Sequence, residues 1–244
     1  MRPPPLPHQI DVLRLVIDRV RDHQSVPLVA FDLDGTLFDN RHRTLRIVQE
    51  FAQSVSSTDP ELSAKLSRLE DVAQISYLLS DTVRGLGIEH SEALKAISSF
   101  WRDRFFTDDY CLFDRAEVGA VAFVRACYEA GASIVYLTGR DVPAMLLGTV
   151  RSLRDNGFPI GVAGIHLVLK PDASMPDEAF KRSALPSLDR AGDLVAFFDN
   201  EPANCNVCLA HSPECLTILL DTQHVPGAPP ADRGVQVVTD FRTA

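Results

Sequence analysis

Acidic and hydroxyl side chains follow three separate apolar runs in this sequence. Asp32 and Asp34 come directly after the first run, Thr138 follows the second, and Asp199 follows a later one. In open parallel sheets, ligands bind in the crevice outside the carboxyl ends of the strands. If the three runs are strands of one sheet, these four side chains converge on a single crevice.

The spacing of Asp32 and Asp34 points to a cation. Side chains two residues apart on a strand point to the same side, and two carboxylates held close together repel unless a cation or a shared proton intervenes. Mg²⁺ characteristically combines one or two carboxylates with waters and substrate phosphate. Gly35 allows the chain to leave the strand sharply. The pair therefore favours a bound Mg²⁺.

Runs of strand length alternate with amphipathic segments around these residues. The run 27–31 is continuously apolar, as suits a strand buried on both faces, and the periodicity of 9–21 indicates a helix. Further strands are expected at 133–137, 165–169, 194–198, 216–220 and 236–238, and further helices at 117–130, 142–156, 177–188 and 202–210. This alternation predicts an α/β fold, a doubly wound parallel sheet with helices on both faces.

Residues 42–106 interrupt this alternation. Strand signals are few there, and the apolar pattern predicts three helices, at 44–56, 60–86 and 91–106. The block is therefore expected to be a separate helical insert.

Three motifs carry a resemblance to a known family. Asp32-Leu33-Asp34-Gly35-Thr36-Leu37 resembles the nucleophile motif of the haloacid dehalogenase superfamily. Thr138-Gly139-Arg140 is similar to its second motif and Phe198-Asp199-Asn200 to its acidic fourth motif. The motifs follow in the family's order over the whole chain. The resemblance implies a Rossmann-like core with a mobile cap inserted between the first and second motifs.

The resemblance also implies roles for these residues. Asp32 would be the nucleophile that attacks phosphorus, and Asp34 would protonate the leaving group and then activate water. Thr138 would bind a phosphoryl oxygen. Asp32, the main-chain carbonyl of Asp34, and Asp199 would hold Mg²⁺, which neutralises charge at the phosphate.

The family's third motif is a lysine, and its metal site often has a second acidic residue after the fourth-motif aspartate. Lys170 and Lys181 are both candidates for the lysine, and the surrounding sequence favours Lys181. Amides occupy the expected acidic positions, so Asn200, Glu201 and Asn204 all remain candidates to complete the metal shell.

The resemblance sets the domain boundaries at 1–40 and 114–244 for the core and 41–113 for a small all-α cap. The aromatic-rich stretch 100–106 lies at the end of this cap. Aromatic stripes more often pack than bind ligands, so we interpret it as the face that docks the cap onto the core; a wall of the substrate mouth is the alternative. Arg140 is interpreted as a salt-bridging or solvated residue outside the catalytic set.

Together these features predict a Mg²⁺-dependent phosphomonoesterase that acts on a small phosphorylated metabolite. Dehalogenation needs no acid at the position of Asp34, so that residue favours phosphoryl transfer. A phosphosugar mutase, a nucleic-acid-end phosphatase and a non-catalytic phosphate-binding regulator of the same fold remain alternatives. The regulator is the main rival from a different class, and the presence of both nucleophile and acid argues against it, because a pure binder has no use for the two together.

Composition bears on the partners and the compartment. The 244 residues carry a net charge of −9, which argues against a nucleic-acid backbone as the main partner. No run approaches the ~20 apolar residues that span a bilayer, and residues 1–7 form a proline-rich lead-in without the apolar stretch of a secretory signal. We expect a cytoplasmic protein with no membrane partner.

The five cysteines are few and odd in number, which argues against a disulfide framework. Cys205, Cys208, His211 and Cys215 are spaced compatibly with zinc, but no second cysteine pair accompanies them. Cys205 and Cys208 fall one turn apart on an expected helix, where free cysteines commonly fill a core. We therefore interpret them as packing residues.

Overall fold

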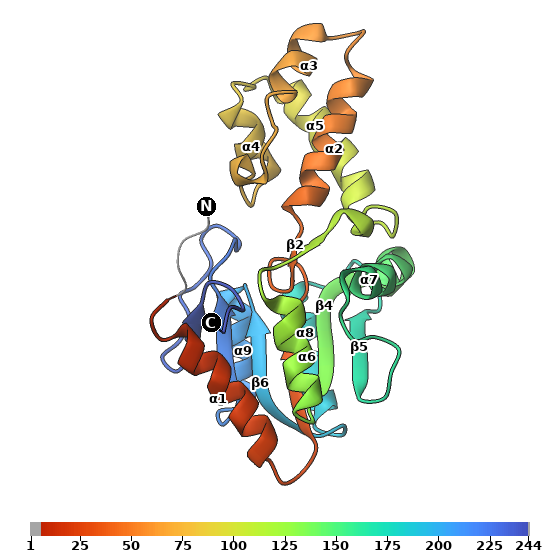
Figure 1. Cartoon of the computed structure of the whole chain (residues 1–244). Coiled ribbons are helices and arrows are strands. Elements are labelled where there is room, and N and C mark those ends of the chain that lie inside the picture. The colour runs from red at the N-terminus through yellow and green to blue at the C-terminus, as the bar shows by residue number, and fades with distance from the viewer. Residues whose placement is uncertain (1–5, 244) are drawn as a thin grey trace.

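A computed structural model describes residues 6–243, and most of the proline-rich lead-in at 1–7 falls outside them. Its centre is a six-stranded sheet in which every pairing is parallel, in the order β5-β4-β1-β6-β7-β8. Helices cover both faces of this sheet, and a separate group of helices stands beyond one end of the strands (Figure 1). The predicted α/β fold is confirmed.

The strands of the sheet are β1 (Pro27–Phe31), β4 (Ser133–Asp141), β5 (Ile165–Lys170), β6 (Asp193–Asp199), β7 (Leu216–Leu220) and β8 (Gln236–Val238). The helices around it are α1 (Gln9–Asp22), α6 (Ala120–Glu129), α7 (Val142–Asn156), α8 (Asp177–Leu188) and α9 (Pro202–His211). Each strand and helix expected for the core is present. β4 is four residues longer than expected, so Thr138 lies within the strand.

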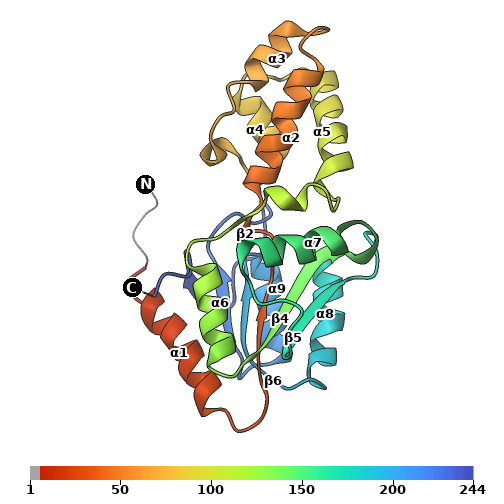
Figure 2. The same ribbon diagram turned by 45° about the vertical axis from the view of Figure 1, so that its right-hand side comes forward.

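The two faces of the sheet bury different clusters because alternate residues of a strand point to opposite sides. Val29 and Phe31 of β1 join the cluster under α1, α6 and α7, whereas Leu28 and Ala30 join the cluster under α8 and α9. Figure 2 shows α1 and α6 side by side on the first of these faces. A sheet buried on both faces leaves only its strand ends free to present polar side chains.

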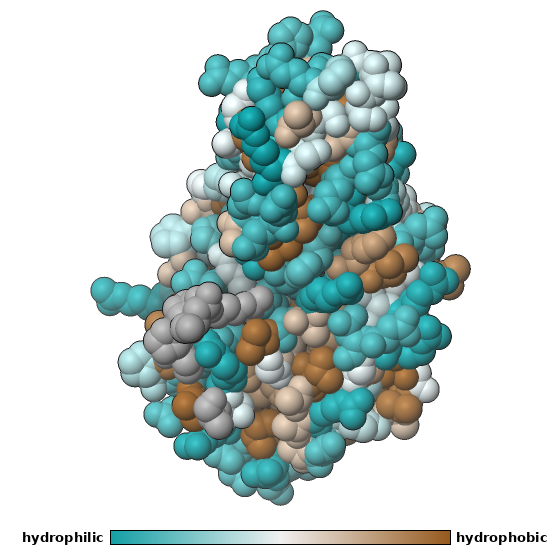
Figure 3. Space-filling view, turned by 45° about the horizontal axis from the view of Figure 1, so that its top comes forward, coloured by the Kyte–Doolittle hydropathy of each residue, from teal (hydrophilic) through white to brown (hydrophobic). Residues whose placement is uncertain are grey.

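The insert folds around its own hydrophobic cluster, whose buried residues all lie between Val48 and Ile97. Its helices are α2 (Arg41–Ser54), α3 (Pro60–Leu66), α4 (Leu79–Gly85) and α5 (Ser91–Phe105). The chain enters and leaves it through a short antiparallel pair, β2 (Phe38–Asp39) and β3 (Arg115–Ala116). Hydrophilic residues cover most of its surface in Figure 3.

The single helix expected at 60–86 is wrong. The segment forms α3, a 3₁₀ turn at Val72–Gln74 and α4. Asp71 and Gln74 bond reciprocally to each other's backbone in a capping box that starts the 3₁₀ turn, and such side-chain bonds compete with helix continuation. As a result, residues 75–78 are not helical and are free to run along the strand ends.

No helix within residues 6–243 is long and apolar enough to cross a membrane.

Candidate active site

Asp32 and Asp199, which are 167 positions apart in the sequence, meet at the carboxyl ends of β1 and β6, where Lys181 joins them. The ammonium of Lys181 donates to Asp32 Oδ1 at 2.7 Å and to Asp199 Oδ2 at 2.5 Å, and all three side chains are buried. Lys181 extends from the first turns of α8. Lys170 lies elsewhere and donates to Asp177 Oδ1 at 2.7 Å. Of the two lysine candidates, Lys181 is therefore the one that contacts Asp32, the expected nucleophile.

The surroundings of Asp32 change its acidity. Burial raises the pKa of Asp32 to about 7; the ammonium of Lys181 opposes this shift and the neighbouring Asp199 adds to it. For Lys181, burial lowers the pKa, but Asp199 and Asp32 outweigh burial and hold it above its usual range. The lysine therefore stays charged, and one positive charge serves two carboxylates.

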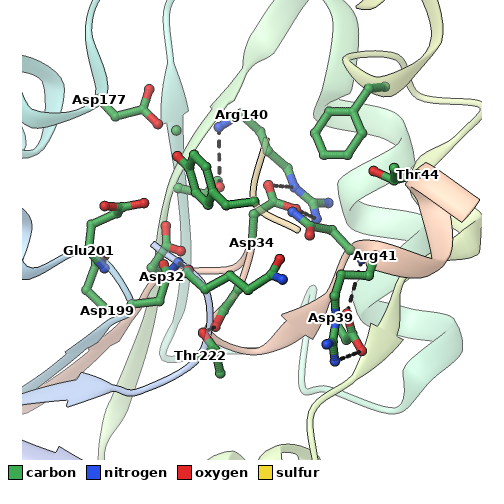
Figure 4. A pocket seen from close by; sticks show the side chains of 18 of the residues that line it. Asp32, Asp34, Asp39, Arg41, Thr44, Arg140, Asp177, Asp199, Glu201 and Thr222 are labelled. Carbon is green, nitrogen blue, oxygen red and sulfur yellow. Dashed lines mark hydrogen bonds and ion pairs between the residues drawn. The ribbon is translucent and has the colours of Figure 1, made fainter. Parts of the chain in front are cut away.

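Asp34 is held by arginines. Arg140 donates to both of its carboxylate oxygens at 2.8 Å (Figure 4), and Arg43 Nη2 donates to Oδ1 at 3.1 Å. Burial favours the neutral form, but Arg140 and Arg43 outweigh it and hold the pKa of Asp34 well below its usual range. Its side chain remains 28% exposed. Asp34 is an ionised carboxylate fixed at the edge of the cavity.

A fourth residue, Asp114, completes this cluster. It accepts from Arg43 Nε at 2.9 Å, from Arg43 Nη2 at 2.6 Å and from Arg140 Nη2 at 2.7 Å. Asp114 and Arg43 are fully buried, and Arg140 is nearly so. We call Asp34, Arg43, Asp114 and Arg140 the arginine–aspartate cluster.

Arg140 is the salt-bridging residue that the sequence suggested, and its partner is a site residue, because its guanidinium binds the Asp34 carboxylate in a fork of two bonds. Sequence reasoning missed Arg43 and Asp114 altogether. One signal was present for Arg43, which precedes the buried Ile47 by four residues and therefore shares the buried face of α2. Asp114 lies in a linker and carries no such signal.

Three polar side chains hold the loop after β1 in shape. Gly35 has φ +79°, and a Cβ there would lie 2.5 Å from the amide nitrogen of Asn200. Thr222 donates to the carbonyl of Gly35 at 2.5 Å, and Thr36 donates weakly to Asp32 Oδ2 at 3.3 Å. This packing fixes the backbone between the two aspartates, and it requires a glycine at position 35.

Thr138 lies beside this loop on β4. Its side chain is buried, lines the cavity above Asp32, and accepts from the backbone amide of Arg140 at 3.3 Å. Its hydroxyl hydrogen therefore remains available to a ligand oxygen. The structure thus brings together Asp32, Asp34, Thr138, Lys181 and Asp199, the five residues selected from the sequence.

The three candidates for the metal shell have different partners. Asn200 donates to the Gln223 carbonyl at 2.5 Å. Glu201 accepts from the Val225 amide at 3.1 and 3.2 Å. Asn204 donates to both oxygens of Asp199, at 3.1 and 3.2 Å, so it is the one of the three that orients an expected metal ligand.

The oxygens at this position suit Mg²⁺. Asp32 and Asp199 already share a cation, the ammonium of Lys181, so the pair requires positive charge. Asp34 turns its side chain to the arginines, which leaves its main-chain carbonyl as the group it could offer. Within residues 6–243 no three His, Cys, Asp or Glu side chains gather as a metal site. Two carboxylates and a carbonyl fit a cation that retains several waters.

The cysteine-rich segment packs as expected. Cys205 and Cys208 are fully buried on α9, and Cys208 belongs to the cluster on that face of the sheet. Cys215 is buried next to Cys208, while the ring of His211 faces Asp189 at 3.6 Å. The interpretation as packing residues is confirmed.

A cavity of about 760 Å³ lies between the strand ends and the insert. Asp32, Asp34, Thr138 and Lys181 line its floor, and residues from the insert line its walls. These include Trp101, Phe105 and Phe106, so the docking interpretation of the aromatic stretch is wrong for these three. Phe100 instead packs on Phe51 inside the insert. The aromatic side chains of this stretch thus lie in two environments, the cavity wall and the interior of the insert.

We compared the sequence and the fold with those of known proteins. No protein-family profile matches the sequence, and no curated protein matches it. Among solved structures, a candidate phosphatase from Clostridium difficile is similar with a TM-score of 0.52, 15% identity, and coverage of 87% of this chain and 90% of that one. A haloacid dehalogenase-like hydrolase from Burkholderia xenovorans has a TM-score of 0.50 and 18% identity, with coverage of 88% of this chain and 93% of that one. Protein tyrosine kinase A from Mycobacterium tuberculosis has a TM-score of 0.51 and 17% identity, with coverage of 88% of this chain and 94% of that one.

Likeness at these identities establishes the fold. The chain has the fold seen in a haloacid dehalogenase-like hydrolase, and the fold that the sequence resemblance predicted is confirmed.

Replacing Asp114 by asparagine is expected to destabilise the protein by about 3–5 kcal/mol, because it leaves two buried guanidinium groups with one carboxylate between them. Urea unfolding followed by circular dichroism measures the change. Asp155→Asn is the matched control, since it removes a carboxylate 2.7 Å from Arg154 on the exposed surface and should change stability little. Equal stability of the two variants would contradict a structural role for the arginine–aspartate cluster.

Proposed function

We propose that this chain is a Mg²⁺-dependent phosphomonoesterase in which Asp32 is the nucleophile. The observation that carries the proposal is the meeting of Asp32, Lys181 and Asp199 on the floor of a cavity that Thr138 also lines. A carboxylate, a fixed ammonium and a hydroxyl donor around one space are what an in-line attack on a phosphate ester needs. The fold shared with a candidate phosphatase supports the same reaction class.

In the first step, the carboxylate of Asp32 attacks phosphorus while the bond from phosphorus to the ester oxygen breaks. The phosphoryl group is then carried by Asp32, and the leaving alkoxide takes up a proton. In the second step, water attacks this phosphoryl group, its proton is removed, and inorganic phosphate leaves with Asp32 restored. Lys181 keeps one positive charge beside Asp32 throughout, and Thr138 donates to a phosphoryl oxygen.

Asp32, the main-chain carbonyl of Asp34, and Asp199 would hold Mg²⁺, with Asn204 orienting Asp199. When bound, the ion would supply positive charge that offsets the negative charge of the phosphate and the nucleophile.

Asp34 remains the proposed acid and base. Arg140 and Arg43 favour its ionised form, which suits the second step, in which it takes a proton from water. The first step requires its protonated form. A substrate phosphate next to Asp34 raises the pKa of that carboxyl by like-charge repulsion, so substrate binding opposes the arginines and prepares the acid.

We propose that residues 41–113 are the cap of this site. They cover one side of the cavity, and their closure over bound substrate would exclude bulk water while the phosphoryl group moves. A space bounded by the core and the insert suits a small phosphorylated molecule better than a protein or a duplex, and we propose a small phosphate ester as the substrate. The excess of negative charge, −9 overall, argues in the same direction.

Asp32→Asn should lower turnover of a generic aryl phosphate by at least about a thousandfold, because the amide is a poor nucleophile at phosphorus. Release of free phosphate with added Mg²⁺ measures this, and a chelator should silence the parental protein. Asp155→Asn serves as a surface control. Parental turnover by Asp32→Asn would refute the assignment of the nucleophile.

The two lysines provide a matched pair. Lys181→Met removes the charge that contacts Asp32 and is expected to lower kcat by about a hundredfold or more. Lys170→Met removes a charge of the same kind that contacts Asp177 instead and should stay within a fewfold of the parent. Circular dichroism of both variants checks their folding. The reverse ranking of the two rates would make Lys170 the active-site lysine.

The acidity of Asp32 predicts a pH dependence. Its pKa is raised to about 7 and the attacking form is ionised, so activity at limiting Mg²⁺ should rise with pH through about 7. A proton and Mg²⁺ compete for the same carboxylate, so saturating Mg²⁺ should move this rise to lower pH. Profiles of kcat/KM at two Mg²⁺ concentrations test this. Identical profiles would mean that the rise belongs to another group.

A further inference from the structure

The cavity is much larger than a phosphate group needs, and its upper walls are aromatic. On one side, the end of α5 contributes Trp101 and Phe105, and Phe106 follows directly after the helix. The indole of Trp101 stacks on Phe105 with ring centroids 4.3 Å apart, and Phe106 meets both rings edge-on. Phe106 is 47% exposed although it is a large apolar residue. Its exposed surface belongs to a wall of the cavity.

This aromatic wall is tied to the reacting groups. The indole nitrogen of Trp101 donates to Thr44 Oγ1 at 3.1 Å. Arg43 lies over the ring of Phe105, with its guanidinium carbon 4.4 Å from the ring centroid, and donates to the Phe105 carbonyl at 3.0 Å. Arg43 in turn binds Asp34. The rings are therefore held at a fixed position relative to the proposed acid, as a preorganised binding surface requires.

Other cap residues lining the cavity come from the segment between the 3₁₀ turn and α4. Gln223 of the core donates to the Ile75 carbonyl at 2.6 Å, and the Tyr77 hydroxyl bonds to Glu201 of the core. Tyr77 and Leu78 line the cavity with 44% and 42% of their surfaces exposed. Two apolar surfaces fastened to the core thus border the space above the phosphate position.

Charge restricts what can lie between these surfaces. The cavity is lined by eight carboxylates and three cationic side chains, Arg41, Arg140 and Lys181. Arg41 is paired with Asp39 by bonds of 2.7 and 2.8 Å (Figure 4). Arg140 binds Asp34 and Asp114, and Lys181 binds Asp32 and Asp199. Beyond the phosphate position, a second negative group on the ligand would face carboxylates, so like-charge repulsion excludes it.

We propose that the substrate is a phosphate monoester whose leaving group carries an aromatic ring and no further negative charge. The ring lies against Trp101 and Phe106, with Tyr77 and Leu78 among the other apolar groups around it. This inference rests on the proposed phosphomonoesterase function and specifies its substrate class. Stacked or edge-on contact between rings adds affinity beyond what apolar area alone supplies, so an aromatic ring is preferred over a saturated ring of the same size.

Three esters of primary alcohols test the preference at similar leaving-group chemistry: benzyl phosphate, cyclohexylmethyl phosphate and 4-carboxybenzyl phosphate. We expect kcat/KM for benzyl phosphate to exceed both others by about tenfold. An equal value for the cyclohexyl ester would overturn the aromatic preference, and an equal value for the carboxylated ester would overturn the exclusion of charge. Comparing kcat/KM for adenosine 5′-monophosphate and for benzyl phosphate shows whether the aromatic ring that the cavity prefers is a nucleobase or a simple phenyl ring.

Phe106→Ala should bring the ratio of kcat/KM between the benzyl and cyclohexylmethyl esters close to one. Leu147→Ala is the matched control, since Leu147 is a large apolar residue that is 68% exposed on α7 and does not line the cavity. It should keep the parental ratio. If Phe106→Ala also kept that ratio, the aromatic wall would not contact the leaving group.

Binding can be followed without turnover because Trp101 is the only tryptophan of the chain. Benzyl phosphate added to Asp32→Asn with Mg²⁺ should change the tryptophan fluorescence with saturation, and ethyl phosphate should do so only at concentrations about tenfold higher or more. If the parental protein hydrolyses none of the esters, the proposed function fails. This titration still shows whether the cavity binds an aromatic phosphate ester. No fluorescence change with benzyl phosphate would overturn the inference.

Discussion

The arginine–aspartate cluster is the constraint on which the rest of the site depends. Two guanidinium groups and two carboxylates lie out of contact with bulk water except at Asp34, and each of the four is paired. Their segments are the loop after β1, the start of α2, the linker before β3 and the carboxyl end of β4. Because an unpaired buried charge costs several kcal/mol, these segments have one arrangement in which all four charges are satisfied.

That arrangement gives two neighbouring aspartates opposite properties. Asp32 is buried and shares one ammonium with Asp199, so its pKa rises to about 7. Asp34, two residues later, faces two guanidinium groups, so its pKa falls. Carboxylates whose environments separate their pKa values in this way are suited to different tasks. In the proposed mechanism, the division of labour between nucleophile and proton-transfer group thus follows from which cations each carboxylate contacts.

Sequence reasoning succeeded where local pattern decides the outcome. Apolar runs followed by Asp32, Thr138 and Asp199 located the strand ends, since burial of both sheet faces leaves little other use for such runs. It failed where partners come from distant segments: Asp114 binds an arginine 71 positions away, and Arg140 binds an aspartate 106 positions away. The aromatic stretch was misassigned because helical periodicity identifies a face but not what that face meets. The prediction of one long helix at 60–86 failed at Asp71, because the bond of its side chain to a nearby backbone amide outweighed the helix propensity of the segment.

The cluster also bears on how the proposed cap can move. Arg43 and Asp114 lie on the two stems through which the chain enters and leaves residues 41–113, and they bind each other at 2.6 Å. An opening that separated them from each other and from Arg140 would expose or unpair buried charges at a cost of about 3–5 kcal/mol, which corresponds to a population lower by roughly a hundredfold to several thousandfold. Motion that leaves the cluster intact has no such cost. Such motion is confined to parts of the insert beyond Arg43, including residues 75–78. Among the polar contacts described above, this segment is joined to the core by the bonds of Gln223 to Ile75 and of Tyr77 to Glu201. The cluster therefore holds the aromatic wall in place while the opposite side of the cavity remains the easier one to displace for substrate entry.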